Sequence, residues 1–272
     1  MEFSVTFLIF FHQLALGGLF ALAATPFHEL DRAFYKSTGA VLLVMALFSF
    51  GGRVSLYLGA REPLRDGGAA LILDALFVAA FVCYLVSLWL ERPLFRARSF
   101  STAILSGTAA LALSAGSFAR GPVWSLESLI YPVSFVLSAL LLGSVTVGML
   151  IGHWYLIDTG QSIEPFVRIF RFFVKSLATQ TGFLVLCGLL FLATGGGTAA
   201  AIARAWESHP LLLAARFLVG QAAPLFLSWM IWKTLLIPHT MAATGLFYIA
   251  LLGVFVGEIL GKQLLALTSL PF

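Results

Sequence analysis

Long apolar stretches separated by short polar connectors run through the whole chain. A helix needs about 20 mostly apolar residues to cross roughly 30 Å of hydrocarbon. Eight stretches reach this length, at about 3–24, 37–58, 68–90, 101–119, 130–157, 165–194, 210–236 and 240–267. The pattern predicts an all-α polytopic membrane protein with eight transmembrane helices. Because no connector is long enough for a soluble domain, we expect residues 1–272 to form a single transmembrane bundle domain.

Local composition adds detail to three parts of this pattern. The fourth stretch, "STAILSGTAALALSAGSFA", is rich in small residues and predicts a helix packed closely against its neighbours. The sequence "TGGGTAA" at 194–200 predicts a flexible connector. "LGGLFALAATPFHEL" and "LGSVTVGMLIGHWYL" resemble each other weakly, which suggests a duplicated four-helix unit, about 1–125 and 126–272.

Lysine and arginine are distributed unequally between the two sets of connectors. One set holds Arg32, Lys36, Arg92, Arg96, Arg98, Arg168, Arg171, Lys175 and Lys233, and the other holds Arg61, Arg65, Arg120 and Arg204. Positive residues accumulate on the cytoplasmic side of membrane proteins. We therefore predict a bacterial cytoplasmic (inner) membrane protein with both termini on the outer, periplasmic side. The fifth and sixth helices are the longest, and we expect them to project past the bilayer on the cytoplasmic side.

Composition agrees with a membrane protein and excludes several other classes. The chain is 60% hydrophobic and only 10% charged, whereas about a quarter of a soluble domain is charged. The net charge of +4 comes from scattered residues, so a nucleic-acid partner is not predicted. The two cysteines form no CxxC motif, and no metal site is predicted. Nucleotide-binding and hydrolase motifs do not occur.

Ionisable and amide side chains interrupt the apolar stretches, and their positions place them in the outer half of the membrane. A charge at this depth costs at least about 2.5–3.5 kcal/mol, so such residues indicate a function or a structural ion pair. The residues are His12, Gln13, Arg53, Asp74, Gln180, Arg216, Gln221 and Glu258. We expect Glu258 to face a bundle interior shared with the charged members of this set. Lys262, one turn further along the helix, can pair with Glu258 or extend to the surface.

These residue types suit the oxidation of a quinol near the outer face. That reaction releases two protons and needs hydrogen-bond partners and titratable acceptors. His12 would accept a proton and Glu258 would pass it out, with Gln13 and Asp74 in the same quinone-binding set. Arg53 and Arg216 would keep the carboxylates ionised. Two other readings stay open: ion pairs that only fix helix packing, and a path for an ion or solute.

A second group of residues lies at the predicted cytoplasmic boundary. Arg168, Arg171 and Lys175 fall on one helix face and predict contact with lipid headgroups or with a soluble partner subunit. His28 and His153 lie near the same boundary, and a b-type haem between them is a further alternative.

The last apolar stretch contains "GEILGK", in which Gly257-Glu258 and Gly261-Lys262 are spaced by two residues. With eight spans and both termini outside, it resembles the quinol-binding membrane anchors of the DMSO reductase and polysulfide reductase (NrfD) type. Lys262 stands where the family pattern has arginine. The resemblance implies that Glu258 belongs to a quinol site and that an iron-sulfur subunit receives the electrons.

The sequence therefore predicts a membrane anchor subunit of an electron-transfer complex, itself non-catalytic, that interacts with menaquinone or ubiquinone. Its expected partners are an iron-sulfur protein, other subunits of the complex, and lipids. A proton- or cation-coupled transporter is the first alternative. An accessory or assembly subunit, or a haem b protein, is the second.

Overall fold

The protein is a bundle of helices in the computed structural model, which describes residues 3–25, 27, 29–59, 68–90, 92–118, 126–158, 160–194, 196–237, 239–268 and 270. Every regular element among these residues is helical. The elements are α1 (Phe3–Ala23), α2 (Arg32–Gly59), α3 (Ala69–Ser87), α4 (Pro93–Gly116), α5 (Leu126–Ile157), α6 (Glu164–Thr194), α7 (Gly196–Ser208), α8 (Pro210–Phe217), the π-helix η1 (Leu218–Ala222), α9 (Ala223–Leu236) and α10 (Thr240–Thr268).

Eight of these helical segments are long and apolar enough to cross a membrane, as the sequence predicted. The seventh of them is the continuous run α8–η1–α9, at 210–236. The fourth begins earlier than expected, at Pro93 rather than near residue 101. Proline at the first helical position has no N–H to leave unpaired and starts the helix, so the basic turn around Arg96 and Arg98 becomes helical.

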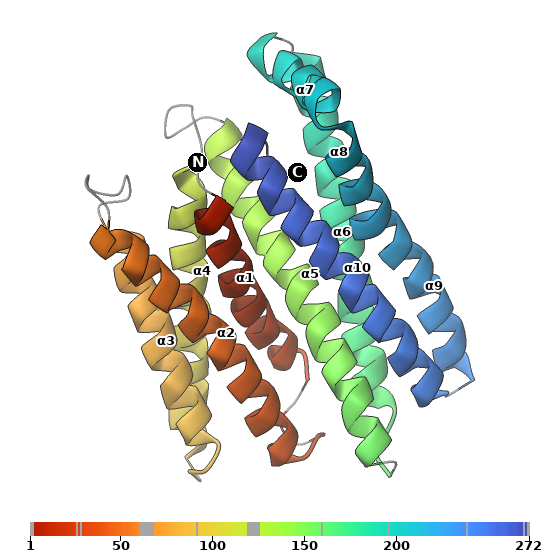
Figure 1. Ribbon diagram of the computed structural model, residues 1–272. Helices are drawn as coiled ribbons and strands as arrows, with labels where there is room; N and C mark the ends of the chain where they lie inside the picture. Colours follow the sequence, from red (N-terminus) through yellow and green to blue (C-terminus); the bar gives the residue numbers. More distant parts are fainter. Residues whose placement is uncertain are drawn as a thin grey trace.

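α1 and α5 lie in the middle of the bundle, and the other helices pack around them (Figure 1). In the most apolar windows of α1 and α5, 78% and 72% of the residues are buried, against 17% for α2. α1 begins and α10 ends at the same end of the bundle, at the top of Figure 1. We call this end the N-side. α2 to α4 flank α1 on one side, and α6 to α10 lie on the other side, around α5.

α1 and α5 touch backbone to backbone in their middle turns. A Cβ atom built on Gly17 would collide with the carbonyl group of Ala139, and one on Gly143 would collide with the backbone of Gly17. Only glycine permits this approach, which small residues favour between membrane helices. The contact fills the centre of the bundle with main chain, so polar groups on the two sides of it are kept apart.

The stretch after α6 is helical where the sequence predicted a flexible connector. α7 begins at Gly196, within "TGGGTAA", and continues to Ser208. The sequence that follows the glycines, "TAAAIARAWES", is rich in strong helix formers. Ala205 of α7 is buried against a small cluster that includes Leu213, while Trp206 stays exposed. The helix thus lies at the N-side, across the ends of α6 and α8 (Figure 1).

The run α8–η1–α9 contains a wide π-helical turn at its centre. Pro224, at the start of α9, has no N–H and leaves a carbonyl of the preceding turn without its usual donor. Single π turns of this kind occur often at functional sites. Here the turn carries Gly220 and Gln221, both buried.

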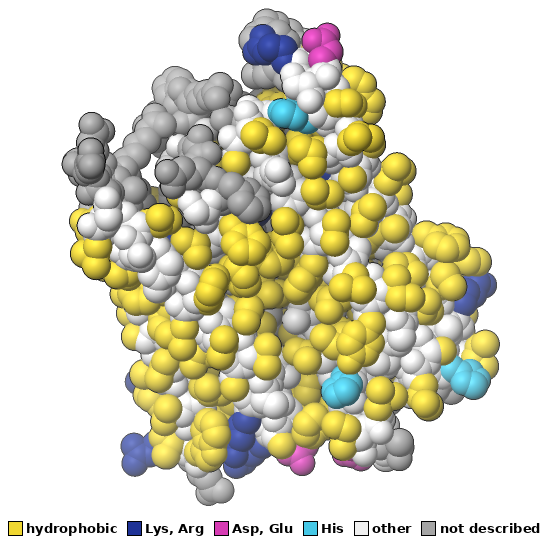
Figure 2. Space-filling model, in the orientation of Figure 1, with side chains coloured by type: hydrophobic (Ala, Val, Ile, Leu, Met, Phe, Trp, Pro, Cys, Tyr) yellow, Lys and Arg dark blue, Asp and Glu magenta, His cyan; other side chains and the backbone are white. Residues whose placement is uncertain are grey.

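The outside of the bundle is apolar over its middle height. Figure 2 shows hydrophobic side chains covering most of the face in view, with basic and acidic side chains mainly at the top and bottom and a basic group at the right-hand edge. Many large apolar residues on α2, α3 and α9 are exposed, including Ile72 (72%) and Phe226 (60%). A soluble protein rarely exposes such a continuous surface, so the eight spans are suited to a lipid surrounding. The four-plus-four repeat stays a prediction.

Candidate functional site: two buried charge centres

The first centre joins α1, α2, α3 and α4 around one carboxylate, and we call it the Asp74 centre. Asp74 Oδ1 lies 3.0 Å from His12 Nδ1, and Asp74 Oδ2 pairs with a terminal nitrogen of Arg53. His12 Nε2 lies 2.9 Å from the carbonyl oxygen of Gly107 on α4. His12 and Asp74 are buried, and Arg53 is 16% exposed at its side chain. Three side chains and one carbonyl thus hold four helices in register.

The Gly107 carbonyl fixes a hydrogen on one nitrogen of the His12 ring. The Gly107 carbonyl can only accept, so Nε2 donates to it. Nδ1 lies 3.0 Å from Asp74 Oδ1, a short contact that does not have hydrogen-bond geometry. Arg53 balances the charge of Asp74 from the other side. While the Gly107 contact is made, the nitrogen of His12 that is left to exchange a proton is Nδ1, which faces Asp74.

The second centre joins α5, α6, α8 and α10, and we call it the Glu258 centre. Glu258 Oε1 accepts from Arg216 Nη2 at 2.9 Å and from Gln180 Nε2 at 2.7 Å. Lys262 Nζ lies 3.9 Å from Glu258 Oε2. Gln180 Nε2 also contacts Ser138 Oγ at 3.1 Å. Glu258 and Arg216 are each only 1% exposed, so this is a fully buried carboxylate between two cations.

Several polar atoms of the Glu258 centre have no hydrogen-bond partner among the described residues. They are Arg216 Nε and Nη1, Gln180 Oε1 and Gln221 Nε2. Gln221 Oε1, in contrast, accepts from the Thr181 hydroxyl at 2.6 Å. Most buried polar groups in proteins are paired, and each exception needs an explanation such as a bound water or ligand. The Glu258 centre therefore has three N–H donors and one oxygen acceptor that its own residues do not use.

The backbones of η1 and α10 cross closely beside these free donors. A Cβ atom on Gly220 would lie 2.6 Å from the Cα of Gly257 and 2.8 Å from Arg216 Nη1. Both positions therefore require glycine, and Gly257 directly precedes Glu258. The wide turn of η1 and the absence of side chains at the crossing bring the Arg216 guanidinium against α10.

The sequence predicted one shared interior for all the charged residues, and the structure separates them into two centres. Their members all lie in the halves of their helices nearest the N-side, as expected. The close packing of α1 on α5 keeps the two sets apart, and no ion pair or hydrogen bond between described residues joins them. Between them, Gln13 Nε2 donates to the Phe135 carbonyl at 2.8 Å, and Lys262 Nζ lies 4.8 Å from the centre of the Phe135 ring.

The boundary residues predicted from the sequence are far from these centres. Arg168 pairs with Glu29, while Arg171 and Lys175 are exposed on the same helix. His153 is exposed, and its Nδ1 lies 3.1 Å from the Tyr248 hydroxyl. His28, the other candidate haem ligand, lies outside the described residues. The part of the chain that the structure describes contains no group of three or more His, Cys, Asp or Glu side chains placed to hold a metal ion.

Sequence reasoning missed Ser138, the Gly107 carbonyl and the π turn of η1. Ser138 is one of many serines in apolar stretches, and a backbone carbonyl has no signature in a sequence. Pro224 was the one available signal for η1. Comparison with models of known protein families and with curated proteins gave no match.

Proposed function

We propose that this protein is the quinone-interacting membrane subunit of an electron-transfer complex, with the Glu258 centre as its quinone site. The observation that carries the proposal is the set of unpartnered polar atoms around the buried Glu258 carboxylate. The resemblance of "GEILGK" to quinol-binding anchors agrees with it. In this proposal the chain lies in a bacterial cytoplasmic membrane, with the N-side outward.

The hydrogen-bonding capacity of the centre suits the head of a quinone. A quinone presents two carbonyl oxygens, and its reduced form presents two hydroxyls. Arg216 Nε and Nη1 and Gln221 Nε2 can donate to a carbonyl oxygen, and Gln180 Oε1 can accept from a hydroxyl. These groups are nine-tenths or more buried, so an interaction with them takes place away from water, where hydrogen bonds are stronger.

Each residue then has a role that follows from its contacts. Bound quinol supplies two electrons, which a partner redox subunit receives, and two protons. Glu258 Oε2 is free of direct hydrogen bonds to Arg216 and Gln180, which both contact Oε1, so it is the atom placed to accept a proton. Arg216 holds the carboxylate in place. Lys262 lies one turn nearer the N-side and already carries its own proton, so it passes protons outward by first releasing that proton and then taking up the one from Glu258.

The cations also set the charge of the centre in each state. With Arg216 and Lys262 charged and Glu258 ionised, the centre carries one net positive charge. Protonation of Glu258 raises this to two, which favours prompt loss of a proton from the site. A centre that discards protons toward one face matches a quinol oxidised near that face.

The proposal is tested on the complex extracted from native membranes in mild detergent through a tag on this chain. We expect an iron-sulfur subunit to co-purify and quinol to reduce an artificial electron acceptor. Glu258→Gln should lower this rate by at least about 100-fold, because a proton acceptor contributes roughly 10²–10⁴. Gln221→Leu should raise the KM for quinol, and it should still fold because Thr181 keeps a second acceptor, the Leu177 carbonyl at 2.8 Å.

A matched control is Gln161→Leu, a glutamine at the opposite end of the bundle whose amide donates to Asp158 and to no other described residue. It should leave both kinetic constants unchanged. If Gln221→Leu and Glu258→Gln assemble and oxidise quinol like the parent, the site is wrong. If no redox subunit co-purifies and no quinol is oxidised, the function is wrong.

A proton-coupled transporter is the second candidate, and the Asp74 centre favours it. The buried His12–Asp74 pair inside the bundle, with Arg53 partly open to the surroundings, has the titratable groups that a proton path needs. Purified protein in liposomes with an imposed pH gradient should then show proton flux that Asp74→Asn removes. Flux equal to that of empty liposomes would reject this candidate.

A further inference from the structure

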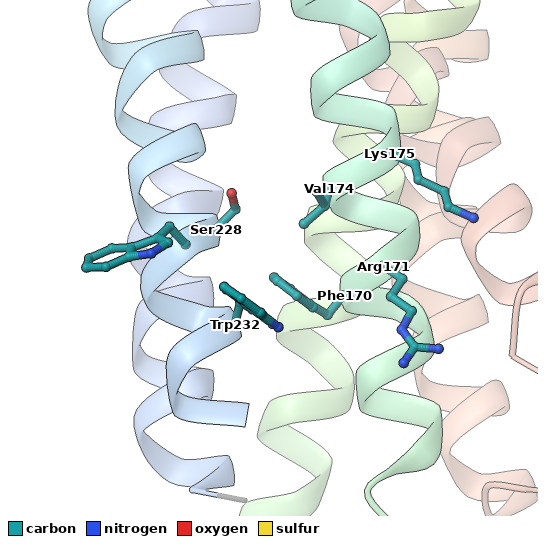
Figure 3. Close-up of a pocket in the computed structure, with 7 residues that line it drawn as sticks. Phe170, Arg171, Val174, Lys175, Ser228 and Trp232 are labelled. Atoms are coloured by element: carbon teal, nitrogen blue, oxygen red, sulfur yellow. The ribbon is translucent and has the colours of Figure 1, made fainter. Parts of the chain in front are cut away.

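A groove runs between α6 and α9 on the side of the bundle away from the Asp74 centre. Its volume is about 360 Å³. Phe170 and Val174 of α6 and Ser228 and Trp232 of α9 point into the space between the two helices (Figure 3). Arg171 and Lys175 complete the lining, and their side chains extend along the flank of α6 that faces away from α9. The groove therefore has an apolar floor, and the two cations stand on the adjoining flank of α6, which forms one rim of the groove.

The groove lies toward the end of the bundle opposite the N-side. α6 has 31 residues and spans about 46 Å, which exceeds the roughly 30 Å of a hydrocarbon core. Its first turns therefore reach the headgroup region, and Arg171 and Lys175, in the third and fourth turns, can extend their long side chains toward it. Trp229 and Trp232 are 52% and 48% exposed, and tryptophan is enriched at this boundary. An acyl chain would reach the floor from the hydrocarbon while its headgroup stays at the rim.

The charges around the groove are one-sided. None of its lining residues is acidic. Arg168, one turn before Arg171, is already paired with Glu29, whereas Arg171 and Lys175 have no ion-pair partner among the described residues. Lys233 adds a third cation beside the groove, with its Nζ 5.1 Å from the centre of the Trp232 ring. The rim is thus complementary to a negatively charged group.

We propose that this groove binds one anionic phospholipid. An acyl chain packs against Phe170, Val174 and Trp232, and the phosphate lies at the α6 edge of the groove, where the long exposed side chains of Arg171 and Lys175 turn toward it. Basic residues at the edge of a membrane attract acidic lipids, and their apolar stems can lie along the floor while the charged ends reach the phosphate. The site is independent of the Glu258 centre, which lies in the other half of the bundle.

The test measures lipid binding to the purified full chain by native mass spectrometry, with equal amounts of phosphatidylglycerol and phosphatidylcholine added. We expect about a tenfold preference for one phosphatidylglycerol molecule. R171Q/K175Q should abolish the preference. The matched control R32Q/R98Q removes two exposed cations from α2 and α4 at the same end of the bundle and should retain it.

A second measurement locates the lipid. Phosphatidylglycerol with brominated acyl chains should quench tryptophan fluorescence in the parent, and W229F/W232F should lose most of this quenching. The proposal would be overturned if R171Q/K175Q kept the preference for phosphatidylglycerol. It would also be overturned if R32Q/R98Q lost that preference to the same extent. So would a dimer in which bromine no longer quenches Trp232, because a second copy of the chain would then cover the groove.

Discussion

Lys262 lies inside the bundle with its Nζ 4.8 Å from the centre of the Phe135 ring, and the residue is only 4% exposed. A lysine this close to the end of α10 could extend to the surface, yet it turns toward Glu258 and an aromatic face. Its burial gives Glu258 a second cation in addition to Arg216. The two cations lie at different distances from the carboxylate, so replacing each of them should have a different effect on stability.

We predict that Arg216→Gln lowers the free energy of unfolding more than Lys262→Gln does. Removing one partner of a close buried pair costs about 3–5 kcal/mol, because the other charge is left uncompensated. Arg216 contacts Glu258 at 2.9 Å, whereas Lys262 lies 3.9 Å away. When Lys262 is replaced, Arg216 remains beside Glu258 and still compensates its charge. Denaturant unfolding in detergent micelles measures both. Equal losses would mean that the two cations share the carboxylate evenly.

The glycine crossing of η1 and α10 predicts a position-specific effect of one methyl group. Gly257→Ala should destabilise the protein by about 1–3 kcal/mol, because a Cβ atom there would collide with the Cα of Gly220. Gly245→Ala lies on the same helix, where a Cβ meets nothing within 4 Å, and should be neutral or slightly stabilising. Thermal unfolding of the two variants checks this. A milder effect at Gly257 than at Gly245 would contradict the close crossing.

The Asp74 centre predicts unequal effects of removing its members. Asp74→Asn leaves Arg53 and the His12–Gly107 contact without a counter-charge and should strongly reduce accumulation in the membrane. Arg53→Gln should cost less, because Arg53 is 16% exposed and Asp74 keeps His12 as a partner. Quantitative blots of membrane fractions compare them. The prediction fails if the arginine variant accumulates less than the aspartate variant.

Sidedness can be determined with single cysteines at the two ends of the bundle. With Cys83 and Cys187 replaced by alanine, Ser208→Cys at the end of α7 should react with a membrane-impermeant maleimide on intact cells. Gly160→Cys, in the exposed connector between α5 and α6, should react only after the cells are opened. This result follows from the excess of basic residues at the second end. The reverse pattern would invert the orientation.

The apolar stretches predicted the number of spans, because the length needed to cross a bilayer is a property of the chain alone. Their ends were less predictable. Proline at the first position extended α4 toward Arg96 and Arg98, and helix formers after the glycines made α7 helical. Both outcomes depend on the helix propensity of a few neighbouring residues, which a hydropathy pattern does not report.

The depth of the polar residues could be predicted, but their partners could not. Position along a helix follows from counting, whereas direction around it depends on which helices are neighbours. His12 and Glu258 were expected in one interior, and the glycine contact of α1 with α5 separates their surroundings. The partners that complete each centre, such as Ser138 and the Gly107 carbonyl, depend on that arrangement as well.

α1 is synthesised before α3, α4 and α5, and it is one of the two most enclosed helices in the finished bundle. Until α3, α4 and α5 have been synthesised, His12 and Gln13 have neither Asp74, the Gly107 carbonyl nor the Phe135 carbonyl to bond. We therefore expect these polar side chains to disfavour exposure of α1 to lipid during synthesis, until the helices that carry their partners have been made.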